Sequence, residues 1–264
     1  MATEHPEGAR TAWVTGASSG IGQAIAVALG GLGWRVAIGA RRVEKLDETA
    51  AQIAAAGGTP FVHPLDVCDP AGVDAFCAAS VSALGPVDVL VNNAGIAWPG
   101  ALHDVDDDVH RRVVETNLLG PIYMTRRAVR SLLDRDAPGD IVFVSSDVTV
   151  HPRPKMPAYG ASKAGVEHLA NTVGMELEGT GIRTSVVRVG PTLTGFGDEW
   201  DTATFDSLLP EWQRFGLQRH WNTNDVATIA RAVVMVVTLE PGTSVSVVEL
   251  QPTPPRSPSV PRAS

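Results

Sequence analysis

The chain contains little cysteine: Cys68 and Cys77 are the only two among its 264 residues. Two cysteines cannot build a disulfide framework, and their spacing matches no zinc pattern, so we expect no metal site. No apolar run reaches membrane-spanning length without interruption. The first ten residues are polar and lack the apolar core of a signal peptide. These absences predict a soluble, cytoplasmic protein with reduced thiols.

Positive charge is also scarce relative to negative charge. The chain has 21 Lys and Arg residues against 29 Asp and Glu residues, a net charge of −8. This balance argues against nucleic acid as a partner, because phosphate neutralisation dominates affinity for it. Apolar residues make up 44% of the chain and charged residues 19%, as in globular proteins. The length fits one large domain with a substantial core.

Seven short β-branched runs alternate with longer Ala-rich helical patterns along the chain. Each run is continuously apolar, as is typical of strands that are buried on both faces. The runs span residues 11–15, 35–39, 59–64, 87–92, 140–146, 183–189 and 244–250. Repeated strand–helix–strand units predict an α/β fold with a doubly wound parallel sheet and helices on both faces. We expect a single domain over 1–252, followed by a flexible Pro- and Ser-rich tail at 253–264.

The first strand runs into the glycine-rich stretch "TGASSGIG" at residues 15–22. Its glycines permit a tight turn and let backbone N–H groups approach a pyrophosphate. A helix starting near Gly20 would direct the positive end of its dipole toward that phosphate. Three glycines are a weak signal alone, but their position between a strand and a helix makes the signal a good one. The cofactor-binding residues expected in this stretch are Gly16, Ser18, Ser19, Gly20, Ile21 and Gly22.

The end of the second strand lacks the acidic residue that would hold the 2′-hydroxyl of NAD. The sequence there is "IGARR", and the guanidinium groups of Arg41 and Arg42 suit a 2′-phosphate. We therefore expect NADP(H) to be preferred over NAD(H); the alternative is a pair of exposed arginines that opens the next helix. Asp66, which precedes Val67 after the third strand, would accept from the adenine amino group or cap the helix that begins near Asp69.

Five separated motifs together resemble those of the short-chain dehydrogenase/reductase family. They are "TGASSGIG" at 15–22, "NNAG" at 92–95, "TNLLG" at 116–120, "SS" at 145–146 and "YGASK" at 159–163. The resemblance implies a Rossmann-like sheet, oxidoreductase activity and a catalytic tetrad of Asn117, Ser146, Tyr159 and Lys163. Ser146 is preferred to Ser145 because it lies thirteen residues before Tyr159, the usual separation in the family.

The resemblance also implies further cofactor contacts. Asn93 and Gly95 would lie by the adenosine ribose and the nicotinamide side of the pocket, and Tyr159 and Lys163 also belong to the cofactor site. Many members have Pro-Gly after the sixth strand, followed by a Thr. Here Val189 takes the place of the proline, whereas Gly190 and Thr194 remain. We expect this loop still to reach the nicotinamide carboxamide, with less backbone restriction.

Tyr159 and Lys163 lie four residues apart in a predicted helix and therefore share a face. A free phenol has a pKa of about 10, and a neighbouring ammonium is expected to lower that pKa. Tyr159 would then act as general acid toward an alkoxide or general base toward an alcohol. Ser146 would donate to the substrate oxygen. By resemblance, Lys163 would bind the nicotinamide ribose, and the backbone of Asn117 would help to hold a proton-relaying water. Each of these residues taken singly also admits a structural role.

The stretch 195–221 is too long for a plain connection and predicts a substrate lid with a short helix or two, hinged at Gly195 and Gly197. Its aromatic residues favour a bulky hydrophobic ketone or secondary alcohol. Alternatively, some of them anchor the lid to the core or to a neighbouring subunit, and His151 simply faces solvent. The expected substrate contacts are Trp98, Ser146, His151, Met156, Tyr159, Trp200 and Trp212.

The expected function is that of an NADP(H)-dependent ketoreductase or alcohol dehydrogenase, because the Asn–Ser–Tyr–Lys set is complete. The alternative is a nucleotide-sensing protein that binds cofactor without turnover, for which a broken tetrad would be expected. An isomerase or dehydratase acting on sugar nucleotides would need a longer C-terminal region. By resemblance, the helices that carry Asn117 and Tyr159 pair across two-fold axes, giving a homodimer or homotetramer.

Overall fold

The computed structural model describes residues 9–194, 200, 202–217 and 220–255. Its strands are β1 (Thr11–Thr15), β2 (Arg35–Ala40), β3 (Thr59–Pro64), β4 (Val89–Asn92), β5 (Gly139–Ser146), β6 (Ile182–Val189) and β7 (Val247–Leu250). They form one sheet in the order β3-β2-β1-β4-β5-β6-β7, and every neighbouring pair is parallel. The predicted doubly wound sheet is confirmed, although β4 and β7 begin two or three residues later than the sequence patterns suggested.

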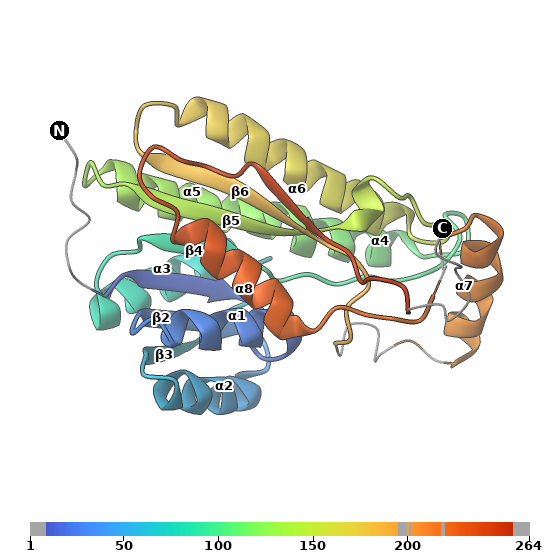
Figure 1. Cartoon of the computed structure of the whole chain (residues 1–264), viewed down its shortest axis with the longest axis horizontal. Helices are drawn as coiled ribbons and strands as arrows, with labels where there is room; N and C mark the ends of the chain where they lie inside the picture. Colours follow the sequence, from blue (N-terminus) through green and yellow to red (C-terminus); the bar gives the residue numbers. More distant parts are fainter. Residues whose placement is uncertain (1–8, 195–199, 201, 218–219, 256–264) are drawn as a thin grey trace, which may run out of the picture.

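Helices cover both faces of this sheet (Figure 1). One layer consists of α1 (Gly20–Gly30), α2 (Val43–Ala55) and α8 (Val226–Val237), and the other contains α3 (Pro70–Leu84), α5 (Gly120–Leu133) and α6 (Pro157–Glu176). The short α4 (Asp107–Val114) leads through a π-helical segment, η1 (Glu115–Leu119), directly into α5.

Side chains of successive strand residues enter two different cores. In β5, Val142 and Val144 pack in the core below α1 and α8, whereas Ile141 and Phe143 pack in the core below α5 and α6. This alternation follows from the period of two in a strand. Because both faces are covered, the central strands carry apolar residues on both sides, which explains the nearly continuous apolar runs in the sequence.

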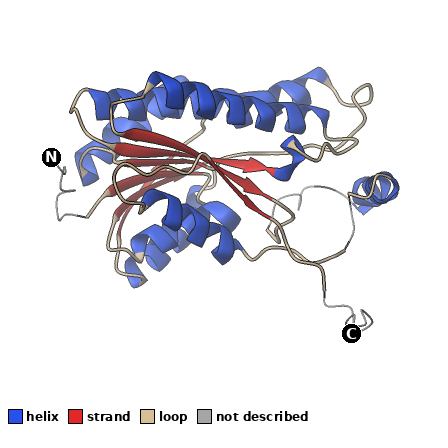
Figure 2. Ribbon diagram, turned by 45° about the horizontal axis from the view of Figure 1, so that its top comes forward, coloured by secondary structure: helices blue, strands red, loops and turns tan. Residues whose placement is uncertain are grey.

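All strands of a parallel sheet end at the same edge, and the loops that follow them gather there. The strand order reverses between β1 and β4, the point at which sheets of this kind bind ligands. Beyond this edge lies α7 (Thr202–Arg214), separate from both helix layers (Figure 2). The site is therefore framed by the strand ends on one side and α7 on the other.

The predicted lid contains one described helix, α7, which includes Pro210. The proposed hinges Gly195 and Gly197 lie outside the described residues, as does the tail from residue 256 onward. Within the described ranges, no helix is both long enough and apolar enough to cross a membrane.

Candidate active site

The glycine loop between β1 and α1 is tightly packed against the loop that follows β4. Gly16 has a φ of +67°, and a Cβ placed on it would lie 2.8 Å from the Cα of Ala94. A Cβ on Gly22 would overlap the side-chain amide of Asn93 and the Gly16 carbonyl. Glycine is therefore required at both positions by backbone shape and by close approach. The first N–H groups of α1 directly follow this glycine loop, an arrangement that fits a pyrophosphate.

Asn93 braces this glycine loop. Its Nδ2 donates to the carbonyl oxygens of Thr15 and Gly16 at 3.0 and 3.1 Å. The hydroxyl of Thr15 in turn accepts the backbone N–H groups of Asn93 and Ala94, each at 3.0 Å. Sequence reasoning missed this bracing role. The predicted position of Asn93 beside the adenosine ribose stays a prediction.

Arg42 reaches back from the start of α2 to the same loop. Its Nη2 donates to the hydroxyls of Ser18 and Ser19 at 3.2 and 2.9 Å. Arg41 and Arg42 are both exposed and directly precede α2. This agrees with the alternative interpretation, a pair of exposed arginines at the start of a helix. The guanidinium of Arg42 and the two serine hydroxyls nevertheless form a cluster of donors next to the glycine loop. Such a cluster fits a phosphate group.

The end of β3 corrects one of the two interpretations of Asp66. The carboxylate of Asp69 caps α3, accepting from the N–H groups of Ala71 and Gly72, each at 3.0 Å. Asp66 instead accepts from the N–H of Cys68 at 3.0 Å and is exposed. The interpretation of Asp66 as the helix cap is therefore wrong, because α3 begins one residue after Asp69. The adenine contact of Asp66 and the buried Val67 stays a prediction.

The loop after β6 meets the glycine loop from the opposite side. A Cβ on Gly20 would lie 3.3 Å from the Cβ of Thr194, which places this threonine beside the start of α1. The N–H of Gly190 donates to the carbonyl of Leu250 at 2.9 Å, and a Cβ on Gly190 would overlap the side chain of Gln251. The structure thus brings Thr194 to the expected cofactor side, and Gly190 is packed against the end of β7.

Lys163 on α6 is buried beside the end of β5. Its Nζ donates to the carbonyl of Val144 at 2.8 Å and lies 5.9 Å from the ring centroid of Tyr159. A Cβ on Gly95 would lie 3.4 Å from that Nζ and 3.3 Å from Oδ1 of Asn117. Lys163, Asn117 and Gly95 are therefore immediate neighbours.

Asn117 lies in the π-helical segment η1 and is buried. Its Oδ1 accepts from the N–H of Ile96, and its Nδ2 donates to the carbonyl of Ile96, both at 2.8 Å. The same Nδ2 donates to the hydroxyl of Ser162 at 3.0 Å, which itself donates to the carbonyl of Tyr159 at 2.8 Å. The side chain of Asn117 therefore fixes the loop after β4 to the first turns of α6.

The two adjacent serines at the end of β5 have different partners. Ser145 donates to Oε1 of Glu167 on α6 at 2.7 Å. Ser146 donates to Oδ1 of Asp147 and accepts from the N–H of Val148, both at 3.3 Å. Ser145 is thus bound to α6, whereas Ser146 also makes a hydrogen bond with Tyr159 and is the serine beside it.

The ionisation of Tyr159 differs from what the sequence suggested. Burial raises the pKa of Tyr159 to about 12; a hydrogen bond with Ser146 opposes this rise, the charge of Asp147 adds to it and the charge of Arg153 opposes it. Burial also lowers the pKa of Lys163 to about 8, against the opposing charge of Glu167. The expectation that the ammonium lowers the phenol pKa is therefore wrong for this structure. Desolvation of the phenol dominates the ionisation of Tyr159.

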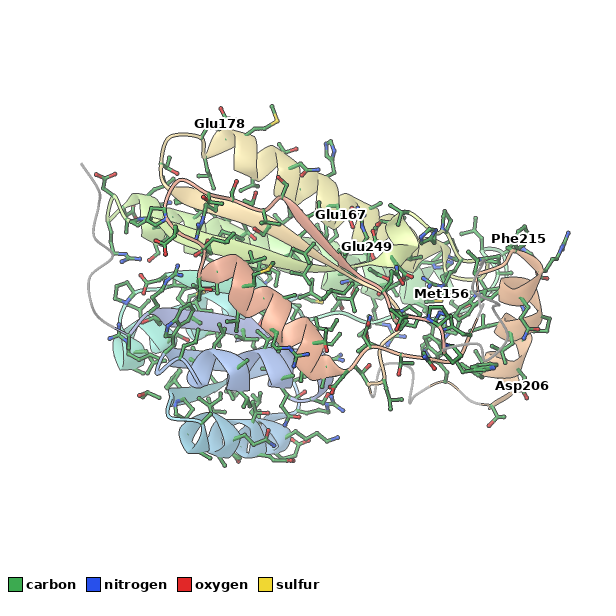
Figure 3. The ribbon with its side chains drawn as sticks, in the orientation of Figure 1. Met156, Glu167, Glu178, Asp206, Phe215 and Glu249 are labelled. Atoms are coloured by element: carbon green, nitrogen blue, oxygen red, sulfur yellow. The ribbon has the colours of Figure 1, made fainter. Side chains whose placement is uncertain are left out.

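A polar network behind the tetrad was not predicted. Glu167, one turn beyond Lys163 on α6, accepts from Ser145, from Thr149 at 2.9 Å and from two nitrogens of Arg188 at 3.0 and 2.7 Å. Arg188 on β6 also donates to Glu249 on β7 at 2.8 Å. Figure 3 shows Glu167 and Glu249 close together at this end of the sheet. The only sequence signal was the helical spacing of Glu167 from Lys163.

The predicted substrate residues occupy varied environments. Met156 is buried just before α6, between the end of the sheet and α7 (Figure 3). The indole N–H of Trp200 donates to the carbonyl of Ala97 at 3.2 Å. Trp98 is 44% exposed, and His151 is exposed. Trp98 lines an open depression together with Lys155, Thr204 and Ser207. Their contact with a substrate stays a prediction.

Trp212 ties α7 to the loop before α6. Its indole N–H donates to the carbonyl of Pro154 at 3.1 Å, and its ring lies 5.7 Å from the guanidinium carbon of Arg153. Nζ of Lys155 donates to the carbonyl of Ser207 at 2.9 Å. These contacts favour the interpretation in which some aromatic residues anchor the lid helix.

Known proteins share this sequence pattern and fold. Residues 10–204 match the family model described as short chain dehydrogenase. A putative ketoacyl reductase of Streptomyces coelicolor is 35% identical over 248 residues, covering 89% of this chain and 92% of that protein.

Two solved structures with bound nucleotide have the same fold. The alcohol dehydrogenase of the archaeon Thermococcus sibiricus, complexed with 5-hydroxy-NADP, has a TM-score of 0.80 at 27% identity, covering 96% of this chain and 100% of that one. Actinorhodin polyketide ketoreductase with NADPH has a TM-score of 0.79 at 31% identity, covering 95% and 97%. The chain belongs to the short-chain dehydrogenase/reductase family of oxidoreductases.

Proposed function

We propose that the chain is an NADP(H)-dependent oxidoreductase that interconverts a carbonyl, a ketone or an aldehyde, with an alcohol. The observation that carries this proposal is the grouping of Tyr159, Ser146 and Lys163 at the carboxyl edge of the sheet. This group stands beside a glycine loop whose shape fits a dinucleotide. When bound, the nicotinamide supplies or accepts the hydride.

In the reductive direction, Tyr159 gives its proton to the carbonyl oxygen as the carbonyl carbon takes the hydride. With a pKa of about 12, the phenol is protonated throughout the neutral range and is ready to act as the acid. Ser146 donates a hydrogen bond to the same oxygen and holds it near the phenol. The high pKa of Tyr159 thus keeps the phenol in the protonated form that the reductive direction requires.

Lys163 is the group that returns a proton to Tyr159. Its pKa of about 8 lets it lose and regain a proton near neutral pH. Because the side-chain amide of Asn117 is occupied by Ile96 and Ser162, its backbone is the part left to hold a relaying water. Lys163 also lies beside Gly95, where it can bind a ribose hydroxyl.

NADP(H) is proposed over NAD(H) because of the donors at the end of β2. Arg42, Ser18 and Ser19 form a cluster suited to a 2′-phosphate. The end of β2 reads Gly39-Ala40-Arg41-Arg42, with no carboxylate to hold a 2′-hydroxyl. The two solved relatives described above carry 5-hydroxy-NADP and NADPH, which supports the same choice.

The proposed substrate is bulky and hydrophobic. Met156 and the aromatic residues of α7 border the space beyond the strand ends, and relatives named ketoacyl reductase and polyketide ketoreductase support a ketone. We further propose a homodimer or homotetramer in the cytoplasm, with a single domain over 1–252. Two apolar side chains exposed on α5 and α6, Leu133 and Met175, support pairing through these helices.

The test is a fluorescence titration with NADPH and NADH, followed by a panel of bulky ketones with NADPH absorbance as the readout. We expect NADPH to bind more tightly than NADH, and turnover to vanish in Tyr159→Phe while NADPH still binds. Turnover that persists in Tyr159→Phe would contradict the mechanism. NADPH binding without turnover on any carbonyl or alcohol would favour the nucleotide-sensing alternative.

A further inference from the structure

A buried carboxylate stands directly beside the proposed catalytic serine. Asp147 follows Ser146 in the chain and begins the 3-10 segment η2 (Asp147–Thr149). Asp147 is only 4% exposed, and its Oδ1 is the acceptor of the Ser146 hydroxyl at 3.3 Å. A buried charge in this position is costly unless it is paired. The pairing of Asp147 therefore decides what happens to the Ser146 proton.

Arg153 supplies that pairing with two parallel hydrogen bonds. Its Nη1 lies 2.7 Å from Oδ1 and its Nη2 lies 2.8 Å from Oδ2 of Asp147. Nε2 of Gln251, beyond β7, donates to Oδ2 at 3.3 Å. This fork geometry is the strongest form of arginine–carboxylate contact. Compared with the two hydrogen bonds from Arg153, the hydrogen bond from Ser146 to Asp147 is longer and weaker.

Arg153 also connects the carboxylate to the lid helix. Its guanidinium carbon lies 5.7 Å from the ring centroid of Trp212 on α7. The next two residues contact α7 as well, through the carbonyl of Pro154 with Trp212 and through Lys155 with Ser207. A continuous chain of contacts therefore runs from the Ser146 hydroxyl to α7.

We propose that Asp147 and Arg153 are positioning residues of the reaction. The hydroxyl of Ser146 has one hydrogen, for which Asp147 and Tyr159 compete with the substrate oxygen. By pairing with both carboxylate oxygens, Arg153 makes Asp147 a weaker acceptor of that hydrogen. The contact of Arg153 with Trp212 makes this weakening dependent on the position of α7. The inference rests on the proposed function in one respect: Ser146 must donate to the substrate oxygen.

The kinetic test compares Arg153→Gln, Asp147→Asn and the double variant with wild type on the ketone that the wild-type enzyme reduces. Arg153→Gln leaves an unpaired carboxylate beside Ser146. We expect kcat to fall about tenfold or more, still less than the roughly hundredfold loss on removing such a donor outright. KM and NADPH affinity should change much less. The double variant removes both charges and should recover most of the lost kcat. A double variant no faster than Arg153→Gln would overturn the proposal.

The second readout does not depend on turnover. Amide hydrogen exchange of α7, measured without cofactor, should rise in Arg153→Gln and in Trp212→Leu. It should stay at the wild-type level in Arg111→Gln, whose ion pair with Asp108 is exposed on α4. Unchanged exchange of α7 in Arg153→Gln would overturn the link to the lid. If the wild-type chain reduces no carbonyl, the proposed function is contradicted. The hydrogen-exchange comparison still decides whether Asp147 and Arg153 hold α7 in place.

Discussion

Nζ of Lys163 donates to the main-chain carbonyl of Val144 at 2.8 Å, which fixes the ammonium under the last residues of β5. The backbone acceptor carries no charge, so it only partly offsets the desolvation of the cation. This explains why burial lowers the pKa of Lys163 to about 8. Tyr159 and Lys163 share this property: burial is the largest cause of the pKa shift of each.

The first prediction concerns stability and pH at Lys163. Between pH 8 and 10.5, the bounds set by its folded and ordinary pKa values, the unfolded chain binds more protons at this residue than the folded chain. Stability contributed by Lys163 must therefore rise with pH in that window. We expect the free energy of unfolding of wild type, relative to Lys163→Met, to increase from pH 8 to pH 10 in urea titrations. A flat difference across this range would contradict the lowered pKa.

The second prediction concerns the phenol of Tyr159. The chain has only two tyrosines, so Tyr123→Phe leaves Tyr159 as the single ionising phenol. Its absorbance titration should have a midpoint above the ordinary 10, toward about 12. Because the charge of Asp147 raises this pKa and that of Arg153 lowers it, Asp147→Asn should move the midpoint down and Arg153→Gln should move it up. A midpoint below 10 would mean that the ammonium outweighs burial.

The third prediction tests the choice of nucleotide. Arg42→Ala removes donors next to Ser18 and Ser19. Hydrogen bonds to charged groups contribute about 1.5–3 kcal/mol, so NADPH should bind roughly ten- to hundredfold more weakly. NADH affinity should stay unchanged, since it lacks the 2′-phosphate. Arg111→Ala on α4 is the matched control, and fluorescence titration is the measurement. Equal weakening of both nucleotides would assign Arg42 to another part of the dinucleotide.

The fourth prediction concerns the network around Arg188. Replacement of Arg188 by Met leaves Glu167 without its ion-pair partner; both side chains are about 15% exposed. Removing one member of a buried pair costs about 3–5 kcal/mol, and this partly solvated pair should cost about 2–3 kcal/mol. Arg111→Met, which breaks a pair with Asp108 that is 64% and 75% exposed, should cost less than about 1 kcal/mol. Urea unfolding that gives equal losses for the two variants would contradict the burial argument.

The sequence was sufficient for the sheet and for the shared helix of Tyr159 and Lys163, for a physical reason. Continuous apolar runs arise only where both faces of a strand are covered, so β5 could be predicted to within one residue of its observed start. Tyr159 and Lys163 share a helix, and their proximity follows from spacing alone. Properties fixed by neighbouring residues in the chain are readable from the sequence.

The remaining features depend on how loops fold back. Asp147 and Arg153 are six residues apart with a proline between them, and no periodicity predicts their bidentate contact. Asp66 and Asp69 are equally good caps by residue type, and only the starting point of α3 decides between them. The pKa of Tyr159 depends on desolvation by the whole domain. The packing of the whole domain sets this desolvation, and no local sequence pattern predicts it.

The parallel order of the sheet also has a consequence for folding. The glycine loop follows β1, Asn93 and Gly95 follow β4, Ser146 ends β5, and Thr194 follows β6. No hairpin joins two of these strands, because each parallel pair is connected through a crossover that must close before the strands meet. The complete site therefore requires all four strands to be docked. During refolding, recovered activity should appear no earlier than the docking of β6, which makes turnover a reporter of long-range assembly.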